Sequence, residues 1–138
     1  MTTSRTVSAP RSLVLEVKLR YVRPPVWRRF TMRDDARFDE LHQVLQVLMG
    51  WEDSHLHQFE TDERRIGLPD FDLPGPPEDE HCVRLRDVLR RPGDRVRYEY
   101  DFGDGWEHDV ELVEVRPHEP RSRYPVILEG RRACPPDD

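Results

Sequence analysis

The chain has 138 residues and a formal net charge of −6, a length that fits one hydrophobic core rather than two. No apolar run reaches the roughly 20 residues of a membrane span, and residues 1–12 lack the apolar centre of a signal peptide. These features argue against a multidomain enzyme and a membrane partner, and predict a globular cytoplasmic protein. The two cysteines, Cys82 and Cys134, lie far apart and in no CxxC pair, so the sequence indicates neither a disulfide framework nor a zinc ribbon.

The charge is unevenly distributed along the chain. Residues 1–37 contain nine Lys or Arg and three Asp or Glu, whereas residues 38–138 contain 13 and 25. The basic first third could face an anion, so nucleic-acid binding is one hypothesis for a partner. Against it, the acidic chain lacks the broad basic surface of a dedicated DNA-binding domain.

The first elements form a hairpin followed by a helix. After a tail at 1–12 that we expect to be disordered, alternating apolar residues predict a strand over 13–19. The prolines of 23–25 interrupt the ladder, and 26–32 predicts the returning strand. Apolar residues at helical spacing then predict a helix over 38–49, with Gly50 placed as its C-cap.

The second half is richer in short strands. Residues 55–60 predict one strand of a short hairpin that closes at 64–66. The proline-rich and acidic stretch 68–80 has no periodicity and predicts a surface loop or a locally disordered insertion.

A helical turn at 85–89 precedes strands over 96–100 and 106–115, joined by a Gly-Asp-Gly turn. Residues 124–128 could add a last strand. This order predicts an α+β fold, in which one main helix covers a largely antiparallel sheet, and a β-grasp-like core is one candidate.

Nucleotide-binding and α/β-hydrolase motifs are absent from the sequence. The most specific segment is the turn at 98–108, which concentrates Asp101, Asp104, Trp106 and His108. One interpretation is a functional site. The other is a structural turn, because Asp-Gly suits a hairpin for its backbone preferences alone and aromatic residues are typical of a core strand.

Histidine spacing raises the hypothesis of a divalent metal cofactor. His55 and His57 flank Leu56, so on a strand both rings leave the same face. Further ligands would come from His108, Asp104, Glu52 or Cys134; otherwise the histidines are half-buried and hydrogen-bonded. We interpret His42 as a helix-surface or packing residue, and Cys134 as an inert thiol, a ligand or a nucleophile.

Arg28 follows Trp27 directly and precedes Arg29, which alternation directs to the opposite face of the strand. A phosphate or carboxylate contact is one interpretation of these guanidinium groups. The other is an ordinary solvent-facing arginine whose stem covers Trp27.

Four motifs occur in this order: RPPVWRRF at 23–30, FDELHQVLQVLMGWEDSHLHQF at 38–59, YEYDFGDGWEH at 98–108 and YPVILEGRRACPP at 124–136. In these motifs the chain resembles the plasmid pRiA4b ORF-3-like family, over about residues 13–138. The resemblance implies a single domain of a largely uncharacterised family. Its members occur on plasmids and chromosomes of bacteria and archaea, and some are labelled as resolvase-like passengers of insertion elements. Similar proteins continue past the CPP motif, so we expect a truncated or short variant.

The positions that match the family's signature carry no established role. They are Pro25, Trp27, Arg28, Leu41, His42, Trp51, His55, His57, Phe59, Asp101, Phe102, Gly103, Asp104, Trp106, His108, Cys134, Pro135 and Pro136.

From these observations the sequence predicts a non-enzymatic binding or accessory module linked to mobile elements. Its candidate recognition surface consists of Arg28, His55, His57, Asp101, Asp104, Trp106 and His108. The first alternative is a metal-dependent hydrolase or nuclease, in which His55, His57, Asp104 and His108 hold a divalent ion that activates water. The second is nucleic-acid binding through the basic first third. The sequence names neither a ligand nor a substrate.

Overall fold

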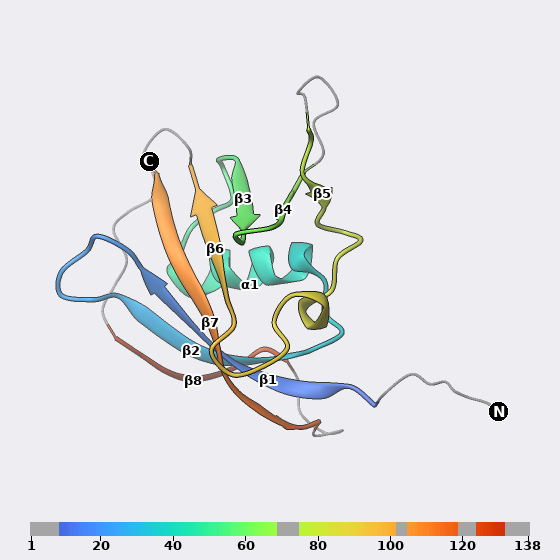
Figure 1. Ribbon diagram of the computed structural model, residues 1–138. Helices are drawn as coiled ribbons and strands as arrows, with labels where there is room; N and C mark the ends of the chain where they lie inside the picture. The colour runs from blue at the N-terminus through green and yellow to red at the C-terminus, as the bar shows by residue number, and fades with distance from the viewer. Residues whose placement is uncertain (1–8, 69–74, 102–104, 119–123, 132–138) are drawn as a thin grey trace.

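A computed structural model describes residues 9–68, 75–101, 105–118 and 124–131, and Figure 1 shows how its elements are arranged. The elements are β1 (Arg11–Leu19), β2 (Trp27–Arg33), α1 (Phe38–Met49), β3 (His57–Glu60), β4 (Arg65–Gly67), β5 (Glu78–Asp79), the 3-10 helix η1 (Leu85–Asp87), β6 (Arg95–Tyr100), β7 (Trp106–Pro117) and β8 (Val126–Arg131). The strands form one eight-stranded sheet in the order β5-β4-β3-β6-β7-β1-β2-β8. Only the β4 and β5 pair is parallel among these neighbours, so the fold is α+β with a mostly antiparallel sheet.

The first strand occupies the interior of the sheet. β1 pairs with β2 on one side and with β7 on the other, both antiparallel. Leu13, Leu15, Val17 and Leu19 are buried, as the alternation predicts. Val14 is also buried, although the pattern places it on the opposite face, and the register with β7 shifts between Val14 and Leu15. β1 is therefore covered on both faces near this irregularity.

The helix buries one face against the strands and ends at a glycine. Phe38, Leu41 and Leu45 are fully buried, and the Phe38 ring meets the Phe59 ring of β3 edge-on at 5.0 Å. Gly50 has φ of 73°, a left-handed conformation that costs glycine little because it has no Cβ. The helix bounds agree with the predicted 38–49.

The segment 68–80 differs from the predicted surface loop. Residues 69–74 lie outside the described part, but Glu78–Asp79 forms β5 beside β4, and Glu80 is buried. The Glu80 amide N–H donates to the Gly67 carbonyl at 2.9 Å, so the end of this segment is tied to the sheet. Composition alone did not reveal these partners, because they come from other segments.

The chain ends also differ in detail from the prediction. β1 begins at Arg11, within the expected tail, and residues 1–8 lie outside the described part. The last strand runs over 126–131 rather than 124–128. In the described ranges, no helix combines the length and the apolar character that a bilayer crossing requires.

Candidate functional site

A cavity of about 510 Å³ opens between α1, the start of β3 and the segment after β5. We call it the histidine cavity, because four histidines line it. Its lining residues are Asp39, His42, Gln43, Asp53, Ser54, His55, Leu56, His57, Leu68, Glu80 and His81. These side chains come from segments that are separated in sequence, and no Lys or Arg is among them in the described part of the chain.

The end of the helix places Asp53 over His42. After Gly50 turns the chain, Asp53 adopts φ of 56°, a left-handed conformation that aspartate tolerates better than most residues. The Asp53 amide N–H donates to Gln46 Oε1 at 2.7 Å, and His42 Nε2 lies 2.8 Å from Asp53 Oδ1. The carboxylate is thus held in the cavity by its backbone as well as by its partner.

A chain of hydrogen bonds fixes the ring of His42. Because Gln46 Oε1 accepts from Asp53, Gln46 Nε2 faces the Tyr98 hydroxyl and donates to it at 2.9 Å. That hydroxyl lies 2.7 Å from His42 Nδ1 and can donate its own proton there. In this arrangement the neutral ring carries its proton on Nε2 and donates it to Asp53. Burial raises the pKa of Tyr98, which keeps its hydroxyl protonated.

His42 and His57 stack face to face, with ring centroids 3.4 Å apart and an angle of 9° between the planes. Burial, together with the nearby His57, lowers the pKa of His42, and the hydrogen bond to Asp53 opposes part of that shift. The neutral form of His42 is therefore favoured. A neutral imidazole has a nitrogen lone pair available for a metal ion or a hydrogen-bond donor.

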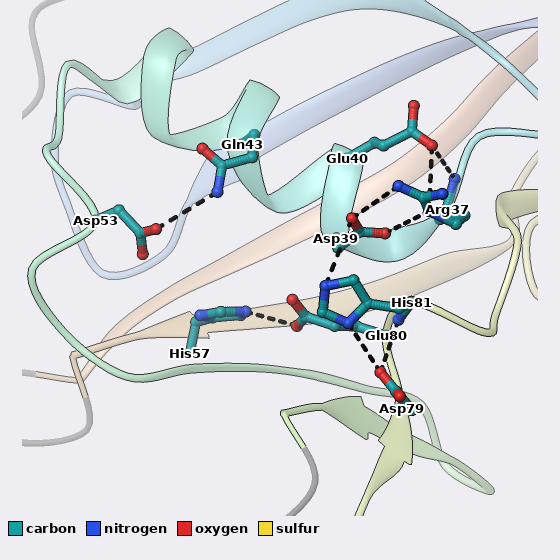
Figure 2. Close-up of polar contacts among 9 residues, drawn as sticks. All are labelled: Arg37, Asp39, Glu40, Gln43, Asp53, His57, Asp79, Glu80 and His81. Atoms are coloured by element: carbon teal, nitrogen blue, oxygen red, sulfur yellow. Dashed lines mark hydrogen bonds and ion pairs between the residues drawn. The ribbon is translucent and has the colours of Figure 1, made fainter.

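Glu80 provides a buried partner for the second ring. His57 Nε2 lies 2.6 Å from Glu80 Oε1, and both side chains are at most 5% exposed. Figure 2 shows the His57 ring directed at Glu80, while His81 lies between Asp39 and Asp79. The hydrogen bond to Asp79 raises the pKa of the exposed His81, and the Asp39 carboxylate contributes to the rise.

The structure separates the predicted site residues into several places. His55 and His57 both line the cavity, but His55 Nε2 lies 3.7 Å from Asp101, whereas His57 pairs with Glu80. His108 is completely buried on β7, and its Nδ1 lies 3.1 Å from the Tyr98 carbonyl oxygen, which is the backbone of β6.

The remaining candidates lie outside this group. Trp106 packs its ring against Trp51, at 6.0 Å between centroids, and Arg28 donates to the Trp27 carbonyl in β2. Asp104 and Cys134 lie outside the described residues, so the hypotheses that involve them stay open.

The sequence predicts neither the acidic members of this cavity, Asp39, Asp53 and Glu80, nor two of its histidines, His42 and His81. The helical pattern indicates a packing or surface role for His42, Glu80 falls in the segment predicted to be a loop, and no motif contains a role for Asp53. A signal for His42 existed: His42 and Gln46 are one helical turn apart beside the apolar residues of the buried face, and both are buried. Glu80 and Asp53 gave no comparable signal, because their partners are set by the tertiary fold.

These features define an α+β protein with a cavity lined by histidines and carboxylates. The chain belongs to the family described as plasmid pRiA4b ORF-3-like protein, whose family model matches residues 11–138. The sequence resemblance to this family is thereby confirmed.

The chain is also similar to two individual proteins. The chain is 38% identical over 125 residues to "Uncharacterized protein y4hQ" of Sinorhizobium fredii, covering 90% of this chain and 64% of that protein. The chain thus spans less than two thirds of that relative's length. It also matches the crystal structure of "Protein of Unknown Function MM3350" from Methanosarcina mazei Go1, with a TM-score of 0.84 and 31% identity, covering 95% of this chain and 75% of that one.

Proposed function

We propose that the protein is a non-enzymatic binding module and that its ligand is a cation held in the histidine cavity. The observation that carries this proposal is the composition of the lining, in which Asp39, Asp53 and Glu80 meet four histidines. No Lys or Arg of the described chain lines the cavity, although Arg37 contacts Asp39 from outside it. The three carboxylates outnumber the one lining histidine whose pKa is raised, His81, and clefts with an excess of one sign of charge concentrate ligands of the opposite sign.

The test is a set of NMR titrations that follow the backbone amides of Asp53, His57 and His81. Zinc chloride, calcium chloride and spermidine are added separately, with sodium phosphate at matched ionic strength as the anionic comparison. We expect at least one cation to shift these amides and phosphate to leave them unchanged. Asp53→Asn should weaken the response, whereas Asp62→Asn, at an exposed position outside the cavity, should not.

Three results would overturn the proposal. If phosphate shifted the same amides as strongly as the cations, or if no cation shifted them, the cavity would not be a cation site. If the zinc-loaded protein hydrolysed a phosphodiester and Asp53→Asn abolished turnover, the metal-dependent hydrolase would replace the binding module.

We further propose that α1 covers the sheet in a β-grasp-like arrangement, which is the first part of a wider proposal. The second part is that residues 13–138 act as a single domain. The third is that the protein works in the cytoplasm as an accessory of mobile elements. Ring contacts of Phe38 with Phe59 and of His42 with Tyr98 support the first part. A crystal structure would test it. Fractionation of host cells and the genomic neighbours of the coding sequence would test the location and the mobile-element link.

A further inference from the structure

We infer that the cation is a divalent transition metal of the zinc class, bound by His42, Asp53 and His57; this inference rests on the proposed function. One ligand atom from each of these three residues lies within 4.8 Å of the other two. In a tetrahedral zinc site neighbouring ligand atoms lie about 3.3 Å apart, because each is roughly 2.0–2.1 Å from the ion. Binding therefore requires the two rings, now stacked with an angle of 9° between their planes, to turn so that their in-plane lone pairs converge on the ion.

The donor atoms select the kind of metal. Two imidazoles with one carboxylate suit zinc and its neighbours in the transition series, whereas Ca²⁺ takes 6–8 oxygen ligands and Mg²⁺ keeps an octahedral shell of oxygens and water. Three protein ligands leave a fourth position for water or a ligand group. The Asp53 side chain is 40% exposed, so this position can be reached from the cavity.

The surroundings of the histidines are those that metal-binding histidines require. Such histidines usually donate their second ring N–H to a carboxylate, a carbonyl or another oxygen, which fixes the ring and raises its basicity. Glu80 contacts Nε2 of His57, which in the neutral ring leaves the lone pair on Nδ1. When Nε2 of His42 binds metal, the ring proton moves to Nδ1 and the hydrogen bond with Tyr98 reverses, so that Nδ1–H donates to the Tyr98 oxygen.

Burial of two histidines is unfavourable unless their ring nitrogens have partners. His42 and His57 are 2% and 8% exposed and stack on each other, and both rings also lie near the Tyr98 ring. Asp53, the third residue of the proposed site, adopts a left-handed backbone conformation that is sparsely populated outside glycine. Polar residues are seldom buried in this way without a specific set of partners. An ion that binds both rings and the carboxylate would stabilise this buried cluster.

The experiment measures zinc binding by the untagged full chain after removal of metal with EDTA. Isothermal titration with zinc chloride should give one site per chain. Asp53→Asn is the main variant, because asparagine keeps the side-chain size and tolerates a positive φ. We expect it to weaken zinc binding at least tenfold, and Glu80→Gln to weaken it about 10- to 100-fold through the orientation of His57.

Matched controls separate this site from adventitious binding. His118 pairs with the Tyr124 hydroxyl away from the cavity, so His118→Gln should leave zinc affinity unchanged. Cys82 is an exposed free cysteine close to His81, and Cys82→Ser should also have no effect. Cobalt(II) should give the visible absorption of a low-symmetry nitrogen and oxygen site in the wild type and not in Asp53→Asn. Circular dichroism of each variant confirms that it is folded.

The outcomes distinguish the metal site from the broader proposal. If zinc fails to bind but spermidine or calcium shifts the cavity amides, the metal assignment is overturned and the cation-binding module stands. If no cation binds, both are overturned. If zinc binds equally well to folded Asp53→Asn, or is lost in Cys82→Ser, the ion lies elsewhere and the assignment to these three residues is wrong.

Discussion

His108 shows how one side chain can make the stability of the protein depend on pH. It is completely buried among aromatic rings, with Trp51 at 5.3 Å and Tyr98 at 5.2 Å between centroids. Its Nε2 has no hydrogen-bond partner among the described residues. Burial lowers the pKa of His108 to about 4, so the folded protein keeps this ring neutral under conditions in which an exposed histidine is charged.

The sign of the effect follows from the two pKa values. An unfolded chain takes up a proton at His108 near pH 6.5, whereas the folded chain takes it up only near pH 4. As the pH falls through this window, the unfolded state gains a proton that the folded state lacks, and the free energy of unfolding falls by about 3 kcal/mol. Above pH 6.5 this contribution is constant.

We predict that His108→Gln removes this part of the pH dependence. Urea unfolding of wild type and variant at pH 7 and at pH 4.5 is the measurement. The difference in free energy of unfolding between the two proteins should shift in favour of the variant at the lower pH. A difference that is the same at both pH values would show that His108 titrates normally in the folded protein.

At the scale of single elements, the end of α1 matters because it positions the loop that carries Asp53. The Trp51 amide N–H donates to the Gln46 carbonyl at 2.9 Å, which satisfies a carbonyl that would otherwise be free at the helix end. A Cβ on Gly50 would meet no heavy atom within 4 Å. The requirement for glycine is therefore conformational rather than steric.

We predict that Gly50→Ala lowers the free energy of unfolding by about 1 kcal/mol, because alanine is strained at positive φ. Gly50→Asn should cost less, since asparagine tolerates this conformation. Val47→Ala, at a position 77% exposed in the last turn of the helix, is the control and should be neutral or slightly stabilising. Equal losses for alanine and asparagine at position 50 would contradict the conformational explanation.

Strands and helices were predictable where the spacing of apolar residues within one segment indicates them. The alternation at 13–19 and the helical spacing at 38–49 come from a buried face, and both elements occur where expected. Sheet neighbours were not predictable in this way, because periodicity says which face is buried but not which strand lies beside it. Nothing in the sequence of β1 indicates that β7 rather than another strand pairs with it.

The candidate site likewise combines a residue that a local sequence pattern indicates with partners that only the tertiary fold brings together. His57 was predicted as a candidate, since a histidine pair in a strand pattern is visible in the sequence. Its partner Glu80 lies 23 positions away in a segment without periodicity, and only the contact at the end of β5 brings it to the cavity. Pairings of this kind depend on the tertiary fold.

At the scale of the whole molecule, the basic first third is largely neutralised by its own surroundings. Several arginines that could face a nucleic acid instead contact carboxylates. These pairs are Arg11 with Asp34, Arg20 with Glu107 and Asp109, Arg29 with Glu16, Arg33 with Asp35, and Arg37 with Asp39. Phosphate binding would have to compete with these contacts.

We therefore predict weak, nonspecific retention of duplex DNA that is absent at about 0.15 M ionic strength. Fluorescence anisotropy with a labelled duplex at several salt concentrations is the measurement. Tight binding with a steep salt slope would support the nucleic-acid hypothesis and show that the arginines exchange partners.

Zinc bound at the proposed site should also stabilise the folded state of the whole molecule. A ligand that binds only the folded state stabilises it by about 2.7 kcal/mol at a free concentration of about 100 times Kd. Zinc at this concentration should raise the thermal midpoint of the wild type, and Asp53→Asn should show little change at the same zinc concentration. A shift of equal size in both proteins would indicate binding outside the cavity.

The strand order has a consequence for how the chain is made. β1 emerges from the ribosome well before its sheet neighbour β7 (Trp106–Pro117). Until β7 is made, the edge of β1 that pairs with it lacks its strand partner. The pairing of β1 is therefore completed only after β7 is synthesised. A ribosome that stalls before Trp106 leaves an aggregation-prone intermediate with an unpaired strand edge, which a chaperone can bind.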